Sequence, residues 1–197
     1  MSASTAVLAD AVWPQRSLAR SAVLAFVGAL LITVCAKIQV PMWPVPMTLS
    51  TFAVLLIALV YGPGLGMATV GLYLAQGALG LPVFASGGGI AYFAGPTAGY
   101  LVGYLVAAGL VGVLARAGWG RPGVQVFVAM LVGSAVIYLF GFAWLATLIG
   151  AQKAWLAGVQ PFLVGDAVKA AMAAGAVPFA WWAIERAGLG NDLGNRR

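Results

Sequence analysis

Two ionisable side chains, Asp166 and Lys169, stand in an otherwise apolar segment at residues 161–184. A spacing of three residues puts both side chains on one face of a helix. Charges inside a membrane-spanning helix are costly and rare, so they indicate a functional site by default. Two interpretations are open: the pair binds a polar ligand, or it neutralises itself and joins helices as a structural ion pair.

The composition indicates that this segment lies in a membrane. Of the 197 residues, 63% are hydrophobic and 7% are charged, and the mean hydropathy is +1.03. These values exclude an ordinary soluble domain. Apolar stretches of about 20 residues favour helices over the shorter alternating strands of a barrel. We therefore expect an all-α integral membrane protein with one domain.

The ionisable and sulfur-containing residues exclude several chemistries. The net charge of +6 comes from basic residues that stand singly, mostly at the ends of apolar stretches, so no nucleic-acid-binding surface is expected. The chain has one cysteine, Cys35, and no histidine. It therefore lacks the material for an internal disulfide, a transition-metal site or histidine-based catalysis. No metal ligand and no catalytic residue is predicted.

Apolar stretches and turn signals divide the chain into a bundle of six expected transmembrane helices. The Gly-Pro-Gly sequence at 62–64 separates the second from the third, and a glycine-rich, aromatic stretch at 82–95 forms an ordered external loop between helices three and four. We expect a loosely ordered tail at 1–17, a six-helix substrate-binding domain at 18–187 and a second tail at 188–197. The expected spans are 18–36, 48–61, 65–81, 96–116, 124–150 and 161–184.

The basic residues predict how these spans are oriented. Lys37 and Lys153 fall in loops on one side of the membrane. Seven arginines fall on the other side, in the two terminal regions and around the loop between the fourth and fifth spans. Because cytoplasmic loops are enriched in Lys and Arg, both termini should be cytoplasmic. The chain would then be a multi-pass protein of a cell membrane.

This orientation brings three unusual features to the external face. They are the proline-rich stretch with Trp43, the glycine-rich loop with Tyr92, and the first turns of the last span with Asp166 and Lys169. Their convergence favours a ligand pocket, and without a ligand we expect the two charges to be poorly paired. Trp43, Tyr92 and Tyr100 would cover apolar parts of the ligand. Further polar groups would come from the side chain of Gln76 and the main-chain amides of Gly88 and Gly89.

A stripe of small side chains marks the first span. Ser21, Ala25, Ala29 and Thr33 recur every four residues, so they share one face on which another helix can approach closely. The spacing leaves open whether that helix belongs to this chain or to a partner.

Five sequence blocks, in this order, resemble the biotin-specific substrate-capture subunits (S components) of energy-coupling factor (ECF) transporters, the BioY family. The resemblance covers residues 38–174, and it is specific because all five blocks occur in order through six spans of matching polarity. The blocks are VPMTLSTFAVLL (45–56), YGPGLG (61–66), GALGLPVFA (77–85), GPTAGYLVGY (95–104) and PFLVGDAVKAA (161–171).

The resemblance implies a non-enzymatic protein of a prokaryotic plasma membrane that captures biotin from outside. It implies a transmembrane coupling subunit and two cytoplasmic ATPases as partners, and no cofactor of its own, because only the partners use ATP. Asp166 and Lys169 match an Asp-x-x-Lys block expected to hold the biotin head or carboxylate. Gly99 and Tyr100 match a block beside the pocket. The stripe on the first span matches the face that docks the coupling subunit in the family.

Three positions depart from the family pattern. Ser50 stands where members usually have Gln, and Ala98 stands where a second Gly is usual. The loop at 86–89 is shorter than in many relatives and lacks a charged residue that they often carry. The group that binds the ligand carboxylate is therefore left open.

Three alternative functions are each consistent with part of this pattern. A stand-alone secondary biotin transporter could use protonation of Asp166, but such proteins typically show inverted repeats and more than one intramembrane ionisable group. Here we find no convincing repeat, and only one acid lies in a span. A membrane enzyme would need a paired nucleophile or a metal set that the chain does not offer. A purely structural subunit would use Asp166 and Lys169 only as an ion pair.

Overall fold

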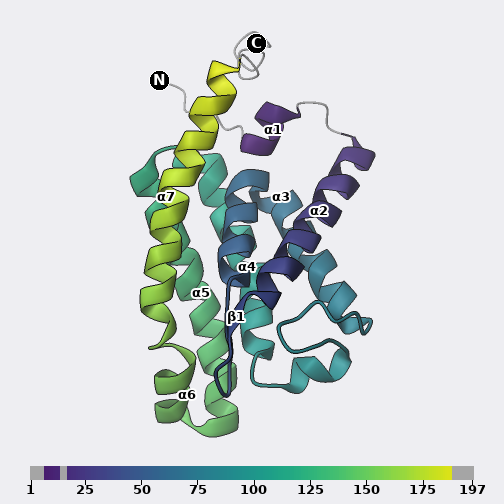
Figure 1. Ribbon diagram of the computed structural model, residues 1–197, viewed down its shortest axis with the longest axis vertical. Helices are drawn as coiled ribbons and strands as arrows, with labels where there is room; N and C mark the ends of the chain where they lie inside the picture. The colour runs from purple at the N-terminus through teal and green to yellow at the C-terminus, as the bar shows by residue number, and fades with distance from the viewer. Residues whose placement is uncertain (1–6, 14–16, 188–197) are drawn as a thin grey trace.

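A computed structural model describes residues 7–13 and 17–187, which form a helical bundle with a short β-hairpin near one end (Figure 1). Apart from the hairpin, all regular elements are helical; η1 is a 3-10 helix and η2 is a turn of π-helix. The elements in chain order are α1 (Leu8–Val12), α2 (Leu18–Lys37), β1 (Gln39–Val40), β2 (Met47–Thr48), α3 (Ser50–Ala78), η1 (Ile90–Ala94), α4 (Ala98–Leu114), η2 (Ala115–Trp119), α5 (Gly123–Ile149), α6 (Ala151–Gly158) and α7 (Phe162–Arg186).

Five helices in the described part of the chain are long and apolar enough to cross a membrane: α2, α3, α4 together with η2, α5 and α7. The sequence predicts six spans, and the difference lies in α3. This element contains both the second and the third expected spans. It is interrupted at Gly62, whose backbone angles (φ 76°, ψ −178°) are not helical. Glycine has no Cβ, so it adopts this conformation without steric cost.

The interruption folds α3 back on itself. A Cβ placed on Gly66 would be 3.3 Å from the Cα of Ala58. In a continuous helix these positions would be about 12 Å apart along the axis, so the contact requires two antiparallel arms. Pro63 opens the second arm, where its missing N–H leaves no hydrogen bond unmade. Figure 1 shows both arms meeting at the end of the bundle that carries α1.

Helix α4 lies at the centre and is the most buried of the long helices. Glycines let its neighbours approach closely. Gly112 lies against Pro63 at the fold of α3, and a Cβ on Gly103 would be 2.9 Å from the Cα of Ile137 in α5. Helices of this kind are held together by close van der Waals packing at small residues. Helix α7 packs mainly on α5 and is the least buried of the five.

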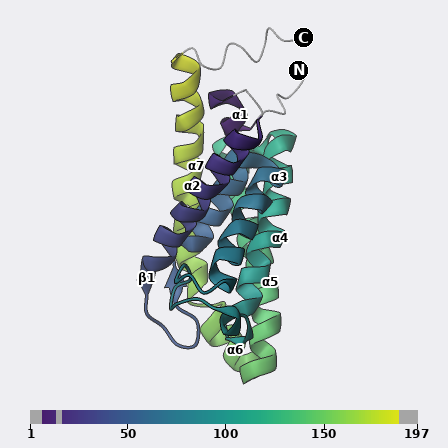
Figure 2. The ribbon, with the colours of Figure 1, turned by 90° about the vertical axis from the view of Figure 1, so that its right-hand side faces the viewer.

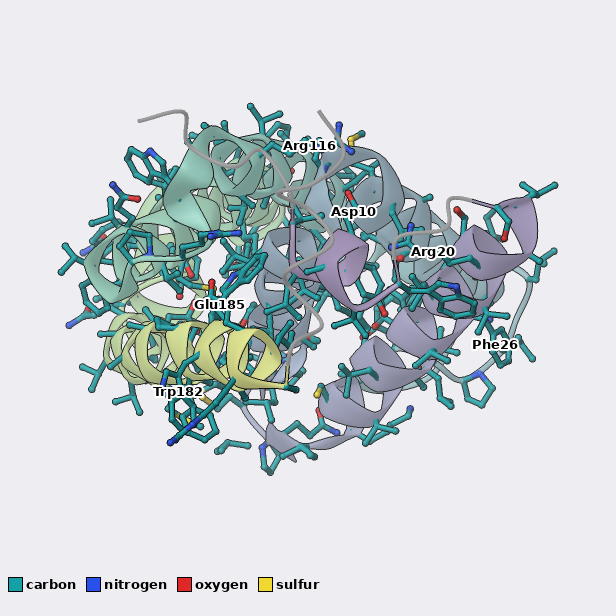
Figure 3. The ribbon with its side chains drawn as sticks, turned by 90° about the horizontal axis from the view of Figure 1, so that it is seen from above. Asp10, Arg20, Phe26, Arg116, Trp182 and Glu185 are labelled. Carbon is teal, nitrogen blue, oxygen red and sulfur yellow. The ribbon has the colours of Figure 1, made fainter. Side chains whose placement is uncertain are left out.

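The segment before α2 is more ordered than the sequence predicts. Arg20 of α2 is 4% exposed, and its Nη2 donates hydrogen bonds to the carbonyl oxygen of Ala9 (2.6 Å) and to Oδ1 of Asp10 (3.2 Å). Viewed from this end of the bundle, Asp10 and Arg20 lie near one another (Figure 3). The predicted loosely ordered tail is therefore wrong for residues 7–13. The predicted C-terminal tail at 188–197 lies outside the described residues.

The opposite end of the bundle carries the β-hairpin, the glycine-rich loop and α6 (Figure 2). Lys37 donates from Nζ to the carbonyl oxygen of Phe84 (2.6 Å), and the side chain of Phe84 is buried. The backbone N–H of Gly89 donates to the carbonyl oxygen of Gly77 (2.7 Å). These contacts hold the loop against α2 and α3.

The close approach of α4 and α5 predicts a difference between two glycine-to-alanine substitutions. Gly103→Ala adds a methyl group against the backbone of Ile137, which cannot move as a side chain can; overpacking of this kind costs about 1–3 kcal/mol. Gly71→Ala is the matched control, because nothing lies within 4 Å of an added Cβ there. We expect Gly103→Ala to lower the apparent melting temperature of the purified protein in detergent, and Gly71→Ala to leave it unchanged or higher. Equal melting temperatures for the two variants would contradict the described packing.

Candidate ligand-binding pocket

A narrow cavity lies among α3, α4, α5 and α7 at the end of the bundle that carries the hairpin. The space that the centre of a water-sized molecule can reach is about 50 Å³. The three segments predicted to converge do meet here: the walls include Val45 and Pro46 of the proline-rich stretch, Phe84 and Tyr92 of the glycine-rich loop, and Asp166 of α7. The cavity thus joins parts of the chain more than 100 residues apart.

Asp166 and Lys169 form a close ion pair in the wall of this cavity. The Nζ of Lys169 lies 2.8 Å from Oδ1 of Asp166, and their side chains are 12% and 5% exposed, respectively. Lys169 also donates to the carbonyl oxygen of Thr48 and to Oγ1 of Thr51, both at 2.9 Å. The hydroxyl of Tyr138 donates to the other carboxylate oxygen, Oδ2 of Asp166, at 2.5 Å.

These contacts correct the expectation of poorly paired charges. An ammonium group has three N–H donors, and Lys169 finds three acceptors. Both oxygens of Asp166 accept hydrogen bonds. The network ties α7 to the start of α3 and to the middle of α5, so the two interpretations of the pair are not exclusive. It joins helices and also lines the cavity.

A second set of hydroxyl groups continues along the cavity. The Oγ of Ser50 lies 2.5 Å from Oγ1 of Thr48 and 2.7 Å from the hydroxyl of Tyr104, and all three residues line the cavity. The hydroxyl of Tyr100 donates to the carbonyl oxygen of Gly158 at 2.7 Å. Hydroxyl groups both donate and accept, so this wall can serve either kind of ligand atom.

Aromatic rings form the side of the cavity under the glycine-rich loop. Phe84 packs edge-on against Tyr73 (ring centroids 5.4 Å apart) and lies 4.7 Å from the ring of Tyr92. Phe93 meets Phe84 edge-on from another side, at 5.6 Å. Gly77 leaves the room that the ring of Phe84 fills. The apolar wall is thus built from the end of α3 and the loop that follows it.

Of the predicted ligand-binding residues, four line the cavity: Asp166, Lys169, Tyr92 and Tyr100. Trp43 does not. Its side chain is 85% exposed and borders a separate surface hollow. Gln76 is half-buried in α3 and is not among the lining residues.

Of the three predicted glycines, two have packing roles and one has a backbone role. Gly88 lies against the main chain of Leu81, and Gly99 lies against the backbone of Phe140 in α5. Gly89 has a φ of 99°, a conformation that favours glycine. These glycines shape the loop and the α4–α5 contact, and none of them lines the cavity.

The small-residue stripe on α2 faces inward over its middle part. Ala25 is 8% exposed and Ala29 is 0% exposed, whereas Ser21 and Thr33 are half-buried. The hydroxyl of Thr33 donates to the carbonyl oxygen of Ala29 within the helix. The prediction that this stripe is a free docking face is therefore wrong for Ala25 and Ala29, because this chain already covers them.

Several cavity residues were not predicted from the sequence. Ser50 and Thr51 lie in a sequence block (45–56) that contributed only to the family resemblance, and neither side chain was assigned to the pocket. Tyr73, Tyr104 and Tyr138 stand singly in apolar helices, where a tyrosine is as common in packing as in binding. Their hydroxyl partners are the signal, and these partners are visible only in the folded chain.

Helices suited to a membrane and a cavity lined by charged, hydroxyl and aromatic groups define a membrane protein that binds a small polar molecule. Within that class the chain belongs to the BioY family, whose model matches residues 4–186.

Named relatives of the chain are biotin transporters. A protein of Pyrococcus horikoshii named as a probable biotin transporter BioY is 46% identical over 144 residues, which are 73% of this chain and 85% of the relative. The biotin transporter BioY of Thermotoga maritima is 37% identical over 158 residues, which are 79% of this chain and 92% of the relative. These names indicate transport and not catalysis.

A solved structure has the same fold. It is the crystal structure of an S component for biotin from an ECF-type ABC transporter, and it matches with a TM-score of 0.70 and 23% sequence identity. The match covers 84% of this chain and 94% of the solved chain. The likeness extends over nearly the whole membrane bundle.

The pairing of Asp166 with Lys169 predicts strong coupling between substitutions at the two positions. Asp166→Asn or Lys169→Met alone leaves one buried charge without its counter-ion, which is destabilising by about 3–5 kcal/mol. The double variant leaves no charge, so we expect it to lose clearly less stability than the sum of the single losses. Apparent melting temperatures of the four proteins in detergent test this coupling. Additive losses would show that the two groups do not depend on one another.

Proposed function

We propose that the chain is the biotin-capturing S component of an ECF transporter in a prokaryotic plasma membrane. Family membership and the names of its relatives support this proposal. One observation carries it at the level of the site. A single cavity offers a carboxylate, an ammonium group and several hydroxyls beside an aromatic wall.

The chemistry of biotin fits these groups. Its ureido ring presents two N–H donors and one carbonyl acceptor. In the proposed complex Asp166 accepts from the N–H groups, and the hydroxyls of Thr51 and Tyr138, which donate to Asp166 in the unliganded network, donate instead to the carbonyl oxygen. The thiophane ring and the apolar chain pack against Tyr92 and Phe84. Hydrogen bonds to charged groups are strong where water is excluded, which favours high affinity.

Binding proceeds as an exchange of partners, because the unliganded network is already complete. A ureido group that offers donors and an acceptor replaces lost hydrogen bonds one for one. A ligand without such groups would leave buried donors or acceptors unpaired, which costs about 1–3 kcal/mol each. The site therefore selects against apolar molecules of similar shape. The cavity is narrow, so the glycine-rich loop and the proline-rich stretch must shift to admit the vitamin.

The ligand-binding set of this proposal differs from the one predicted from the sequence. It keeps Asp166, Lys169, Tyr92 and Tyr100. Three of the cavity-lining hydroxyl residues of α3 and α5 join the set; these are Ser50, Thr51 and Tyr138.

The proposed topology has six membrane crossings, because each arm of α3 crosses once. The end of the bundle that carries α1 faces the cytoplasm, as the arginine excess at that end favours. Arg20, Arg116 and Arg186 belong to this end, whereas Lys37 and Lys153 belong to the opposite end. The cavity then opens to the outside, where the vitamin arrives.

The proposed partners are a transmembrane coupling subunit and two cytoplasmic ATPases, and the chain itself needs no cofactor. The support for this module is the fold shared with a biotin S component of an ECF-type transporter. The outward face of α2 is available to such a partner. It carries large apolar side chains, among them Phe26, Leu30 and Val34.

The proposed binding mode predicts that Asp166→Asn and Lys169→Ala each weaken biotin binding at least tenfold, which is about 1.4 kcal/mol. Asp166→Asn removes the charged acceptor of the ligand from a site that excludes water, and Lys169→Ala removes the counter-ion that holds Asp166 in place. Radiolabelled biotin binding to purified protein in detergent measures the effect. Tyr138→Phe tests the same site with a smaller change, since it removes only one hydroxyl.

The matched control is Glu185→Gln, because it makes the same carboxylate-to-amide change at the other end of the bundle, where Glu185 is exposed and faces Arg121. We expect its affinity for biotin to stay within about twofold of the unmodified protein, since a surface ion pair contributes little. If the Asp166 and Lys169 variants are folded and bind biotin with unchanged affinity, the proposal that this cavity binds biotin is wrong.

Transport should depend on the partner subunits. In cells that lack other biotin uptake, we expect the chain to support uptake when it is expressed with a coupling subunit and ATPases. A variant ATPase that cannot hydrolyse ATP is the control, and it should abolish this uptake. Strong, protonophore-sensitive uptake by the chain alone would favour a secondary transporter instead.

A further inference from the structure

A broad hollow lies on the surface at the cavity end of the bundle. Trp43 and Pro44 of the proline-rich stretch form one side of the hollow, and Leu148 and Leu156 belong to α5 and α6 on the other. Lys153 brings the only charge to its lining. The space open to the centre of a water-sized molecule is about 560 Å³, against about 50 Å³ in the cavity. The hollow is therefore much roomier than the cavity.

Lys153 differs from the other two lysines at this end of the bundle in its contacts. The ammonium groups of Lys37 and Lys169 already hold carbonyl oxygens, and Lys169 also holds Asp166. Lys153 is exposed and makes no hydrogen bond or ion pair to any residue that the structure describes. Of the three lysine ammonium groups at this end of the bundle, that of Lys153 is therefore the one free to bind an approaching anion.

Residues that border the hollow are next in sequence to residues at the cavity. Pro44 borders the hollow and Val45 borders the cavity. Ala157 also borders the hollow, and the next residue, Gly158, accepts the hydrogen bond of the cavity residue Tyr100. At both places, the two spaces are therefore bordered by adjacent parts of the chain.

We propose that this hollow is an outer subsite that takes the carboxylate of the arriving ligand on Lys153 and its apolar chain against Trp43. The inference rests on the proposed function and adds a specificity determinant to it. Because Lys169 is fully paired, the cation that first meets the anionic end of the ligand is Lys153. A single exposed charge at the mouth of a site raises the rate of association more than it changes the affinity.

The test compares biotin with biotinamide, which lacks the negative charge. Association and dissociation rates are measured by stopped flow on protein in nanodiscs of zwitterionic lipid, for the unmodified chain, Lys153→Gln and Lys153→Arg. We expect Lys153→Gln to slow the association of biotin about three- to tenfold, with little change in dissociation. Lys153→Arg should retain the rate, and biotinamide should bind all three proteins at one rate.

The dependence of the association rate on salt is a second readout, which a purely structural role of Lys153 would not affect. The association rate of biotin should fall with ionic strength in the unmodified chain and lose that dependence in Lys153→Gln. Equal association rates for biotin in both proteins would overturn the subsite, and so would an equal slowing of biotinamide. If the effect appears only in nanodiscs with anionic lipid, Lys153 serves a lipid headgroup and the proposal is wrong.

Failure of this inference differs from failure of the proposed function. If the unmodified chain binds biotin and the Lys153→Gln variant has the same association and dissociation rates, only the proposal of an outer subsite is wrong. If the unmodified chain binds no biotin at all, both proposals fall together.

Discussion

The ion pair between Asp166 and Lys169 is the constraint around which the rest of this molecule is arranged. Two charges among apolar helices are tolerable only when every donor and acceptor is satisfied. The chain meets that demand with a hydroxyl from α5, a carbonyl oxygen from the end of β2 and a hydroxyl from the start of α3. Three elements distant in the sequence must therefore meet at one point. The cavity exists because they meet there without filling the space beside the pair.

Much of the fold follows from patterns that the sequence displays directly. Long apolar stretches predict the helices, and the Gly-Pro-Gly turn predicts the reversal at Gly62. The N-terminal segment was harder to predict, because α1 has five residues. A helix that short has no stability of its own. It forms because Arg20 and the surface of the bundle hold it, and such tertiary contacts leave no local pattern.

The site was partly predictable for the same kind of reason. A charge in an apolar helix is conspicuous, so Asp166 and Lys169 stood out. Tyr138 is inconspicuous until its hydroxyl is seen against the carboxylate. Gly88, Gly89 and Gly99 illustrate the opposite error. Their type suits a binding site, but the loop and the helix contact use them elsewhere. Trp43 lies outside the cavity, at the surface hollow. Residue type alone does not indicate which way a side chain points.

The reversal of α3 returns the chain to the level of the cavity, so both arms of one element contribute to its walls. Ser50 begins the first arm, and Tyr73 and Gly77 end the second. Each residue inserted in an arm would turn everything beyond it by about 100° and advance it by about 1.5 Å. A one-residue insertion between Thr51 and Gly62 would thus rotate and shift the cavity-lining residues on one side of the insertion relative to those on the other side. The lengths of the two arms therefore determine the shape of the cavity as directly as the side chains that line it.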